Sequence, residues 1–253
     1  MVFDGQEVEE QENGKSKSRP KAMFVPTMIL LFFMIVAVIF LFSPFFNITG
    51  IEVYGSKYFS EQEIMLLSGI NEEQNIFTAP LNTIEQRLMR IPRLASVNVE
   101  RNFPNQLRIS VEERQTVAYV PYAGYFVELD EQGHAICITE SVTDVNIPII
   151  SGINVTYAEI GQDVSPVKEI SECCKVGAML IKKDISDLSE VSISEDGLIT
   201  VITIDGTKIL LGKKDGIEST LELLVPILNS VREQARQAKV IDLRVESKPV
   251  VTY

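Results

Sequence analysis

The residues in this sequence that are best suited to chemistry are one histidine, three cysteines and a few paired acids. His134 is the only histidine, so histidine-rich metal sites and most Ser/His or Cys/His nucleophile systems lack a base unless His134 supplies it. It directly follows the turn at 130–133, which favours an exposed strand residue. Acid pairs such as Glu112-Glu113 fit the solvated faces of strands better than they fit general acid/base work. We therefore expect no catalytic residue, no metal site and no enzymatic activity.

The cysteines are also better explained by packing than by reactivity. Three cysteines argue against a disulfide framework, and the adjacent Cys173 and Cys174 lie in a helical pattern that favours small buried side chains. Cys137 lies in the apolar run AICI, which predicts the core of a strand. The sequence GKK at 212–214 lacks the preceding glycine-spaced loop that binds phosphate. We expect no cofactor and no small-molecule substrate.

The most distinctive element that the sequence predicts is an apolar stretch near the N-terminus. The 19 residues from Phe24 to Phe42, FVPTMILLFFMIVAVIFLF, carry no charge. A helix of this length covers roughly 28 Å, close to the ~30 Å hydrocarbon core of a bilayer. A cleaved signal peptide would have an apolar region of about 7 to 15 residues and a small-x-small cleavage site, whereas Ser43, Pro44 and two phenylalanines follow here. We therefore predict an uncleaved transmembrane helix over 22–43.

The charges around this stretch predict its orientation. Four basic residues precede it, and the next one after it is Lys57. Because Lys and Arg beside a membrane segment stay on the cytoplasmic side, we predict a single-pass type II protein with a cytoplasmic N-terminus. The tail at 1–21 has no apolar periodicity and is predicted to be disordered. The net charge of −12 lies mostly beyond the anchor. This acidity argues against nucleic acid or an anionic lipid surface as a partner, because both would repel it. It either keeps the exported part soluble or suits a basic partner.

The region 44–115 is predicted to fold as strand, helix, helix, strand, strand, with both helices on one face of a small sheet. The expected elements are a strand at 48–54, a helix from the capping box Ser60 and Glu63 to Gly69, a helix at 81–90, and two strands joined by a turn at 102–105. Alternation predicts that the buried face of the two strands carries Val97, Val99, Leu107, Ile109 and Val111.

The region 116–246 is predicted to be β-rich, and the C-terminal tail 247–253 to be brief. Strands are expected at 117–120, 126–129, 135–138, 188–194, 198–204, 207–211 and 239–245, with a further extended segment at 147–153. Two helices are expected, one at 167–183 and one with the apolar stripe Ile217, Leu221, Leu224, Leu228, Val231 and Ala235. Pro226 should kink the second helix. The whole chain is therefore predicted to be an α+β protein with a mixed sheet, packed helices and one anchor.

The segments IEVYGSKYFSEQEI and RIPRLASVNVERNFPNQLRISVEERQTVAYV resemble the POTRA module of the bacterial cell-division protein family FtsQ/DivIB. The glycine-bearing turn at 211–212, the amphipathic helix and the strand KVIDLRV also resemble this family, in the same order. The resemblance implies a non-catalytic divisome scaffold in the cell membrane at the division septum. It also implies partners of the FtsB/DivIC and FtsL types, through which the protein would regulate septum formation and septal peptidoglycan synthesis.

Two alternative functions were weighed against this interpretation. POTRA modules also occur in transport and outer-membrane assembly factors, but no series of ~10-residue alternating strands typical of a membrane barrel follows here. An anchored exported hydrolase would need a catalytic constellation, and the sequence offers little from which to build one.

The strand predicted at 239–245 is the candidate partner-binding element. A terminal strand with nothing after it to cover it is often a sheet edge, which an incoming strand can extend. In the family that this chain resembles, the partner of the FtsB/DivIC type is held against this end of the β-domain. The predicted binding residues are Val240, Ile241, Asp242, Leu243, Arg244 and Val245. The alternative is an edge that is protected by Lys239, by Arg244 or by the tail with Pro249.

Overall fold

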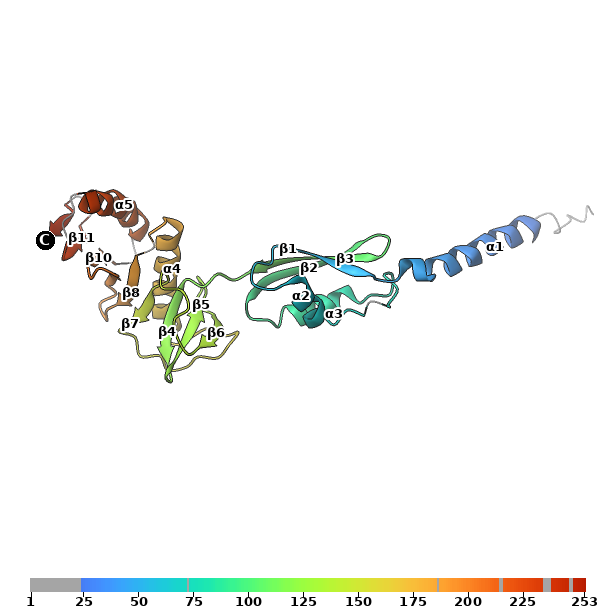
Figure 1. Cartoon of the computed structure of the whole chain (residues 1–253), viewed down its shortest axis with the longest axis horizontal. Helices are drawn as coiled ribbons and strands as arrows, with labels where there is room; N and C mark the ends of the chain where they lie inside the picture. The colour runs from blue at the N-terminus through green and yellow to red at the C-terminus, as the bar shows by residue number, and fades with distance from the viewer. Residues whose placement is uncertain (1–23, 72, 186, 214–215, 234–237, 246–247) are drawn as a thin grey trace, which may run out of the picture.

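A computed structural model describes residues 24–71, 73–185, 187–213, 216–233, 238–245 and 248–253. Three parts follow one another along its long axis: the helix α1 (Phe24–Leu41), a small module of sheet and two helices, and a larger sheet domain (Figure 1). The predicted α+β class is confirmed. The predicted tail at 1–21 lies outside the described residues.

Helix α1 has no protein environment of its own. None of its 18 residues is buried, although almost all of them are large and apolar. It is also the one helix in the described residues that is long and apolar enough to cross a membrane. Because exposing this much apolar surface to water is unfavourable, the helix fits the transmembrane anchor that the sequence predicts.

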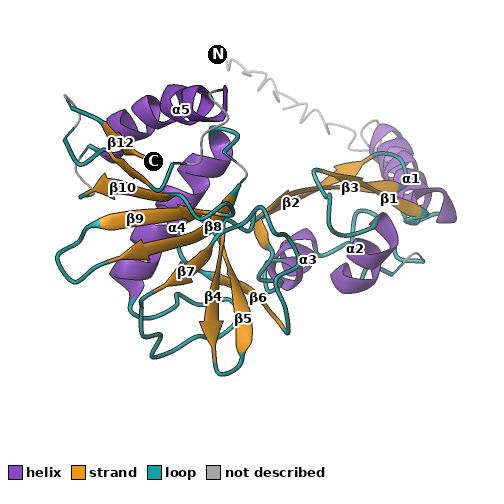
Figure 2. Cartoon of the chain, turned by 60° about the vertical axis from the view of Figure 1, so that its left-hand side comes forward, coloured by secondary structure: helices purple, strands orange, loops and turns teal. Residues whose placement is uncertain are grey.

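The small module has the predicted order of elements. It contains the short helix η2 (Pro44–Phe46) and then β1 (Gly50–Tyr54), α2 (Glu61–Ser68), α3 (Leu81–Leu88), β2 (Leu94–Asn102) and β3 (Gln106–Glu113). The sheet order is β1-β3-β2, with β1 parallel to β3 and β2 antiparallel to it. Both helices lie on the same face of the sheet (Figure 2), and both contribute side chains to one apolar cluster with it. This is the βααββ order that was predicted for 44–115.

Local chemistry explains where helix α2 begins and ends. The Ser60 hydroxyl accepts the Glu63 backbone N–H at 3.2 Å, and the Glu63 carboxylate accepts the Ser60 backbone N–H at 2.8 Å. The hydrogen bonds that the Glu63 carboxylate accepts from the backbone N–H and the hydroxyl of Ser60 lower the pKa of Glu63. Gly69 ends the helix with a left-handed φ of 65°, a conformation that glycine adopts without a steric penalty. The capping box and the glycine stop were both predicted.

The larger domain is built on one mixed sheet. In the described chain its strands are β4 (Ala118–Tyr122), β5 (Tyr125–Leu129), β6 (Ala135–Thr139), β7 (Ile149–Ser151), β8 (Leu188–Ile193), β9 (Ile199–Thr203), β10 (Lys208–Gly212), β11 (Val240–Asp242) and β12 (Val250–Thr252). Their order is β12-β11-β10-β9-β8-β7-β4-β5-β6, and three neighbouring pairs are parallel: β4 with β7, β7 with β8, and β10 with β11. We call this part the β domain.

Two helices cover the core of the β domain. Helix α4 (Val167–Lys182) and helix α5 (Ile217–Glu233) contribute to one continuous apolar cluster with the strands. The predicted stripe of α5 is buried from Ile217 to Val231, and the predicted stripe residue Ala235 lies outside the described residues. Pro226 lies inside α5, and the bend that it should cause stays a prediction.

The prediction about the last strand is wrong. β11 is only three residues long, and it is not an edge, because β12 pairs with it in antiparallel fashion from Val240↔Thr252 to Asp242↔Val250. β11 ends where the Arg244 backbone N–H donates to the Asp242 side chain at 3.1 Å and turns the chain. β12 lies in the segment predicted to be a brief tail at 247–253, and the signal missed there was a run of β-branched residues after Pro249.

The module and the β domain meet at a joint of paired charges. Arg93 donates to Glu128 at 2.5 Å, and Arg114 donates to Asp130 at 2.5 Å. Glu128 and Asp130 are 6% and 2% exposed, so each carboxylate needs its partner. Thr116 adds a hydrogen bond to Glu128 at 2.9 Å. These contacts connect the start and end of the module's hairpin to strand β5 and the turn after it.

Candidate partner-binding edge

Strand β12 forms the end of the sheet, and its backbone is paired on one side. The Thr252 carbonyl accepts the Lys239 backbone N–H at 2.7 Å, so Thr252 directs its backbone toward β11. Because backbone direction alternates along a strand, the N–H and C=O of Val251 point away from the sheet. Among the described residues, no strand pairs with that outer side. The edge is therefore able to accept one further strand.

One side chain of this edge packs against the core, and several others are apolar and exposed. Val251 is partly buried and packs against the core cluster of the β domain. Val250 is 55% exposed, Tyr253 is 43% exposed and Val245 is 58% exposed. An exposed apolar group beside an unpaired strand edge is the combination that a docking strand can use, because it adds buried area to backbone hydrogen bonds.

Charged residues at the edge are engaged with their neighbours. Arg244 donates to Asp242 at 2.6 Å, and this hydrogen bond lowers the pKa of Asp242 and raises that of Arg244. The Lys239 ammonium donates to the Tyr253 carbonyl at 3.2 Å. The ion pair fixes the chain after β11, and Lys239 holds the end of β12. The backbone on the outer side of Val251 takes no part in these contacts.

Gly212 allows β10 to approach the turn after β11. Its φ is +97°, where a side chain is strained, and a Cβ there would lie 3.5 Å from the Arg244 Cα. Next to it, the Leu243 backbone N–H donates to the Leu210 carbonyl at 2.9 Å. The edge is thus supported from the strand beneath it, at the glycine-bearing turn that the sequence singled out.

The structure divides the predicted binding residues into two groups. Ile241 and Leu243 are at most 1% exposed and belong to the core, so they cannot touch a partner in this fold. Arg244 and Val245 are exposed in the connection that follows. The remaining two, Val240 and Asp242, lie in β11 and are half-buried. Sequence reasoning missed Val250 to Tyr253, which lie further out on the same edge.

The groups considered for chemistry serve the fold instead. Burial raises the pKa of the Cys173 thiol to about 12 and that of Cys174 well above its ordinary value, so both stay protonated and unreactive at neutral pH. Cys137 is half-buried rather than a core residue, because its strand β6 lies at the other end of the sheet. His134 is also less exposed than predicted: its ring nitrogens lie 3.4 Å from Asp130 and 3.0 Å from Asp163.

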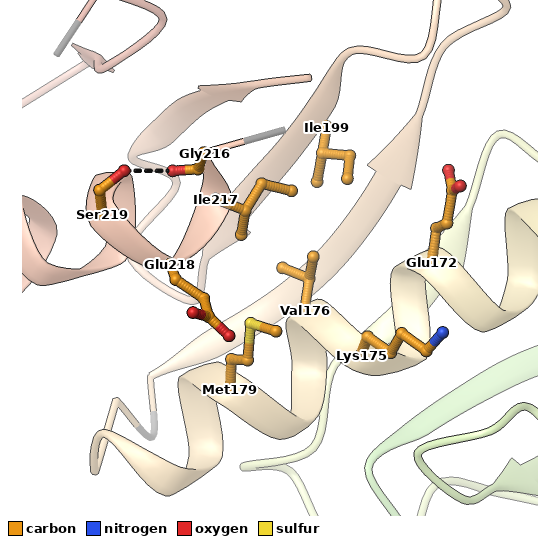
Figure 3. A pocket seen from close by; sticks show the side chains of 9 residues that line it. All are labelled: Glu172, Lys175, Val176, Met179, Ile199, Gly216, Ile217, Glu218 and Ser219. Carbon is orange, nitrogen blue, oxygen red and sulfur yellow. Dashed lines mark hydrogen bonds between the residues drawn. The ribbon is translucent and has the colours of Figure 1, made fainter. Parts of the chain in front are cut away.

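A cavity of about 440 Å³ lies between α4 and the start of α5 (Figure 3). Its wall is formed by Val176, Met179, Ile199 and Ile217, and charged side chains such as Lys175 stand at its border. Ser219 also lines the cavity, and its hydroxyl donates to the Gly216 carbonyl at 2.8 Å. No group of three metal-ligating side chains occurs among the described residues.

Two family models match the chain in succession. The first, described as "POTRA domain, FtsQ-type", covers residues 46–114, and the second, "Cell division protein FtsQ/DivIB, C-terminal", covers residues 118–244, which is half of the chain. The chain belongs to the FtsQ/DivIB family of cell-division proteins. The small module is accordingly its POTRA module, as the resemblance predicted.

Individual relatives agree with this family. The cell division protein FtsQ of Syntrophotalea carbinolica is 29% identical over 216 residues, which cover 83% of this chain and 74% of that protein. DivIB of Clostridium acetobutylicum is 24% identical over 208 residues, 82% of this chain and 83% of that protein. A solved structure, the major extracytoplasmic domain of DivIB from Geobacillus stearothermophilus, is 20% identical, covers 39% of this chain and 78% of that one, and has a TM-score of 0.29. Membership of the family supports a role in cell division.

Proposed function

We propose that this protein is a non-catalytic scaffold of the bacterial divisome. Helix α1 anchors it in the cell membrane at the septum, with the N-terminus in the cytoplasm and the POTRA module and β domain outside. Its partners are the bitopic division proteins of the FtsB/DivIC and FtsL types, and through them it regulates septum formation and septal peptidoglycan synthesis. The family supports the division role, and the charge distribution around α1 supports the orientation.

The observation that carries the binding mode is the open side of β12. An extended segment of the FtsB/DivIC-type partner adds to the sheet there, so the backbone of Val251 supplies hydrogen bonds and register. Selectivity comes from the exposed side chains along the edge, including Val245, Val250 and Tyr253. The site is thus displaced outward from the predicted strand at 239–245, by one strand of the sheet.

The edge is prepared for binding before a partner arrives. β12 is already paired with β11, and Val251 is packed on the core, so this side of the complex loses little conformational freedom on association. When the partner segment is disordered before binding, that segment instead loses most of the conformational entropy of complex formation. This arrangement favours a selective complex that can form and dissociate as the septum is built.

A proline at Val251 tests strand addition directly. Proline removes the outward N–H, and edge strands tolerate proline when that N–H faces solvent, so the fold should persist. We expect Val251→Pro to keep its circular dichroism and melting temperature and to weaken partner binding by about tenfold or more. The matched control Val251→Ala removes side-chain area but keeps the donor, and should bind much more tightly than the proline variant. Binding of the proline variant at the parent's affinity would refute strand addition at β12.

A further inference from the structure

A continuous series of aromatic rings connects the anchor to the POTRA module. The Phe40 and Phe46 ring centroids are 5.4 Å apart, those of Phe46 and Phe77 are 5.2 Å apart, and those of Phe77 and Phe103 are 5.3 Å apart. Phe45 stacks on Phe40 and meets Phe46 in an edge-to-face contact. The series therefore runs from the outer end of α1 to the tip of the hairpin between β2 and β3.

Most of these rings face outward rather than into the module. Phe45 is 59% exposed, Phe103 is 57% exposed and Phe77 is 39% exposed, whereas Phe46 packs partly against the core. We call Phe45, Phe77 and Phe103 the aromatic face. A contiguous exposed apolar surface of this kind marks an interaction site, because leaving it in water is unfavourable.

The segments that form the aromatic face carry no charge of their own, and one cation lies beside them, because the Arg101 guanidinium donates to the backbone carbonyls of Ile76 at 2.8 Å and Ala79 at 3.1 Å. Three segments meet there, 43–51, 74–84 and 102–107, and none of them contains an acidic or basic residue in a chain that is 23% charged. They are joined by a bridge between Asn47 and Asn75 and by a hydrogen bond from the Thr49 N–H to the Asn105 carbonyl at 2.9 Å. The acidity of the chain thus lies elsewhere, and amides surround the rings.

The anchor holds this surface at a defined depth. The Asn75 side-chain amide donates to the carbonyl of Leu41, the last residue of α1, at 2.9 Å. The Ile76 backbone N–H donates to the Phe46 carbonyl at 2.8 Å, and the Ile48 N–H donates to the Gln74 carbonyl at 2.9 Å. With its 18 residues, α1 covers about 27 Å, so its last turn reaches the border of the hydrocarbon core.

We propose that the aromatic face docks on the outer interfacial zone of the same bilayer that α1 crosses. The rings enter the boundary between acyl chains and headgroups, and the neighbouring Asn and Gln amides lie among the headgroups. The occupant is lipid, because the surface is continuous with a membrane helix, its exposed side chains are apolar rings, and its three segments contain no acidic residue that anionic lipids would repel. The proposal rests on α1 as a membrane anchor, and it is independent of partner binding at β12.

The absence of tryptophan from the sequence makes the test selective. A Phe103→Trp variant carries a single tryptophan at the hairpin tip, and the full chain is reconstituted in phosphatidylcholine vesicles with brominated acyl chains. We expect its emission to be blue-shifted and quenched by several-fold relative to unbrominated vesicles. The control Tyr125→Trp places the tryptophan at the first residue of β5 in the β domain, where Tyr125 is 49% exposed, and should not be quenched.

A third variant separates failure of docking from failure of the anchor. Phe32→Trp lies in the middle of α1 and must be quenched if the anchor is inserted. Quenching at 32 without quenching at 103 would overturn lipid docking while the anchor stands. Shielding of Trp at 103 that appears only after a partner membrane protein is added would equally overturn it, since the face would then be a protein interface.

The response to lipid charge and salt adds a second criterion. Because apolar burial drives the proposed docking, and because Arg101 beside the rings is already bonded to backbone carbonyls, the quenching at position 103 should require neither anionic lipid nor low salt. Quenching that required anionic lipid would show electrostatic attachment and would contradict the proposed apolar docking.

Discussion

The ion pair of Asp242 and Arg244 shows how one side chain shapes the docking edge. It turns the chain after β11 and brings β12 back alongside. The hydrogen bond from Arg244 lowers the pKa of Asp242 in the folded protein. Since the folded pKa lies below the unfolded one, the pair contributes stability above the unfolded pKa, and this contribution is lost as the pH falls through the folded pKa.

We therefore expect Arg244→Gln to raise the pKa of Asp242 toward its ordinary value, as measured by NMR titration of the carboxyl carbon. Asp205 is the matched control, because its lowered pKa comes from a hydrogen bond with Thr203 and should stay low in the variant. An unchanged pKa of Asp242 would show that the backbone N–H of residue 244, rather than the guanidinium, sets it.

Residue Ile109 tests the assignment of faces in the POTRA module. It is completely buried in β3, opposite Val99 of β2. Ile109→Asp would place an unpaired charge among apolar neighbours, so we expect it to lower the free energy of unfolding by about 4 kcal/mol and to unfold the module. Leu66→Asp changes a residue that is 82% exposed, and should melt as the parent does. If both variants melt alike, the buried face is wrongly assigned.

At the scale of elements, the sequence predicted what local pattern determines. The POTRA strands alternate clearly, Ser60 and Glu63 define a helix start, and five positions of the α5 stripe are spaced for one buried face, so these elements were found. β11 and β12 are three residues each, which is too short for a periodic signal, and their pairing depends on a turn made by Asp242 and Arg244. The sequence therefore placed the candidate site at β11, one strand further in than β12, which ends the sheet.

The joint between the domains could not be predicted from local pattern at all. Arg93 and Glu128 are far apart in sequence, and nothing beside either residue indicates the other. We expect Arg93→Ala to destabilise the protein by about 3 kcal/mol, because it leaves the buried Glu128 without its cation. The double variant Arg93→Met with Glu128→Met removes both charges and should recover most of that loss. Equal loss in both variants would show that side-chain packing, rather than the charge pair, holds the joint.

At the scale of the whole molecule, the proposed orientation in the membrane rests on the charges before Phe24. We expect protease added to intact spheroplasts to remove the POTRA module and β domain and to spare a label attached at residue 1. A cytoplasmic marker protein must survive the same treatment, as evidence that the membrane is sealed. Loss of the label with survival of the marker would reverse the topology.

The joint at Arg93 and Arg114 and the contact of Asn75 with Leu41 together limit bending along the chain. β12 lies at the opposite end of the molecule from α1 (Figure 1). Under the proposed function, a partner that is tethered in the same membrane would reach β12 only if its own external segment were long enough to span that distance. Its effective concentration at the edge would be greatest when the tether matches this span, and would fall for shorter and longer tethers. The proposed scaffold would thereby select among membrane-bound partners by reach as well as by sequence.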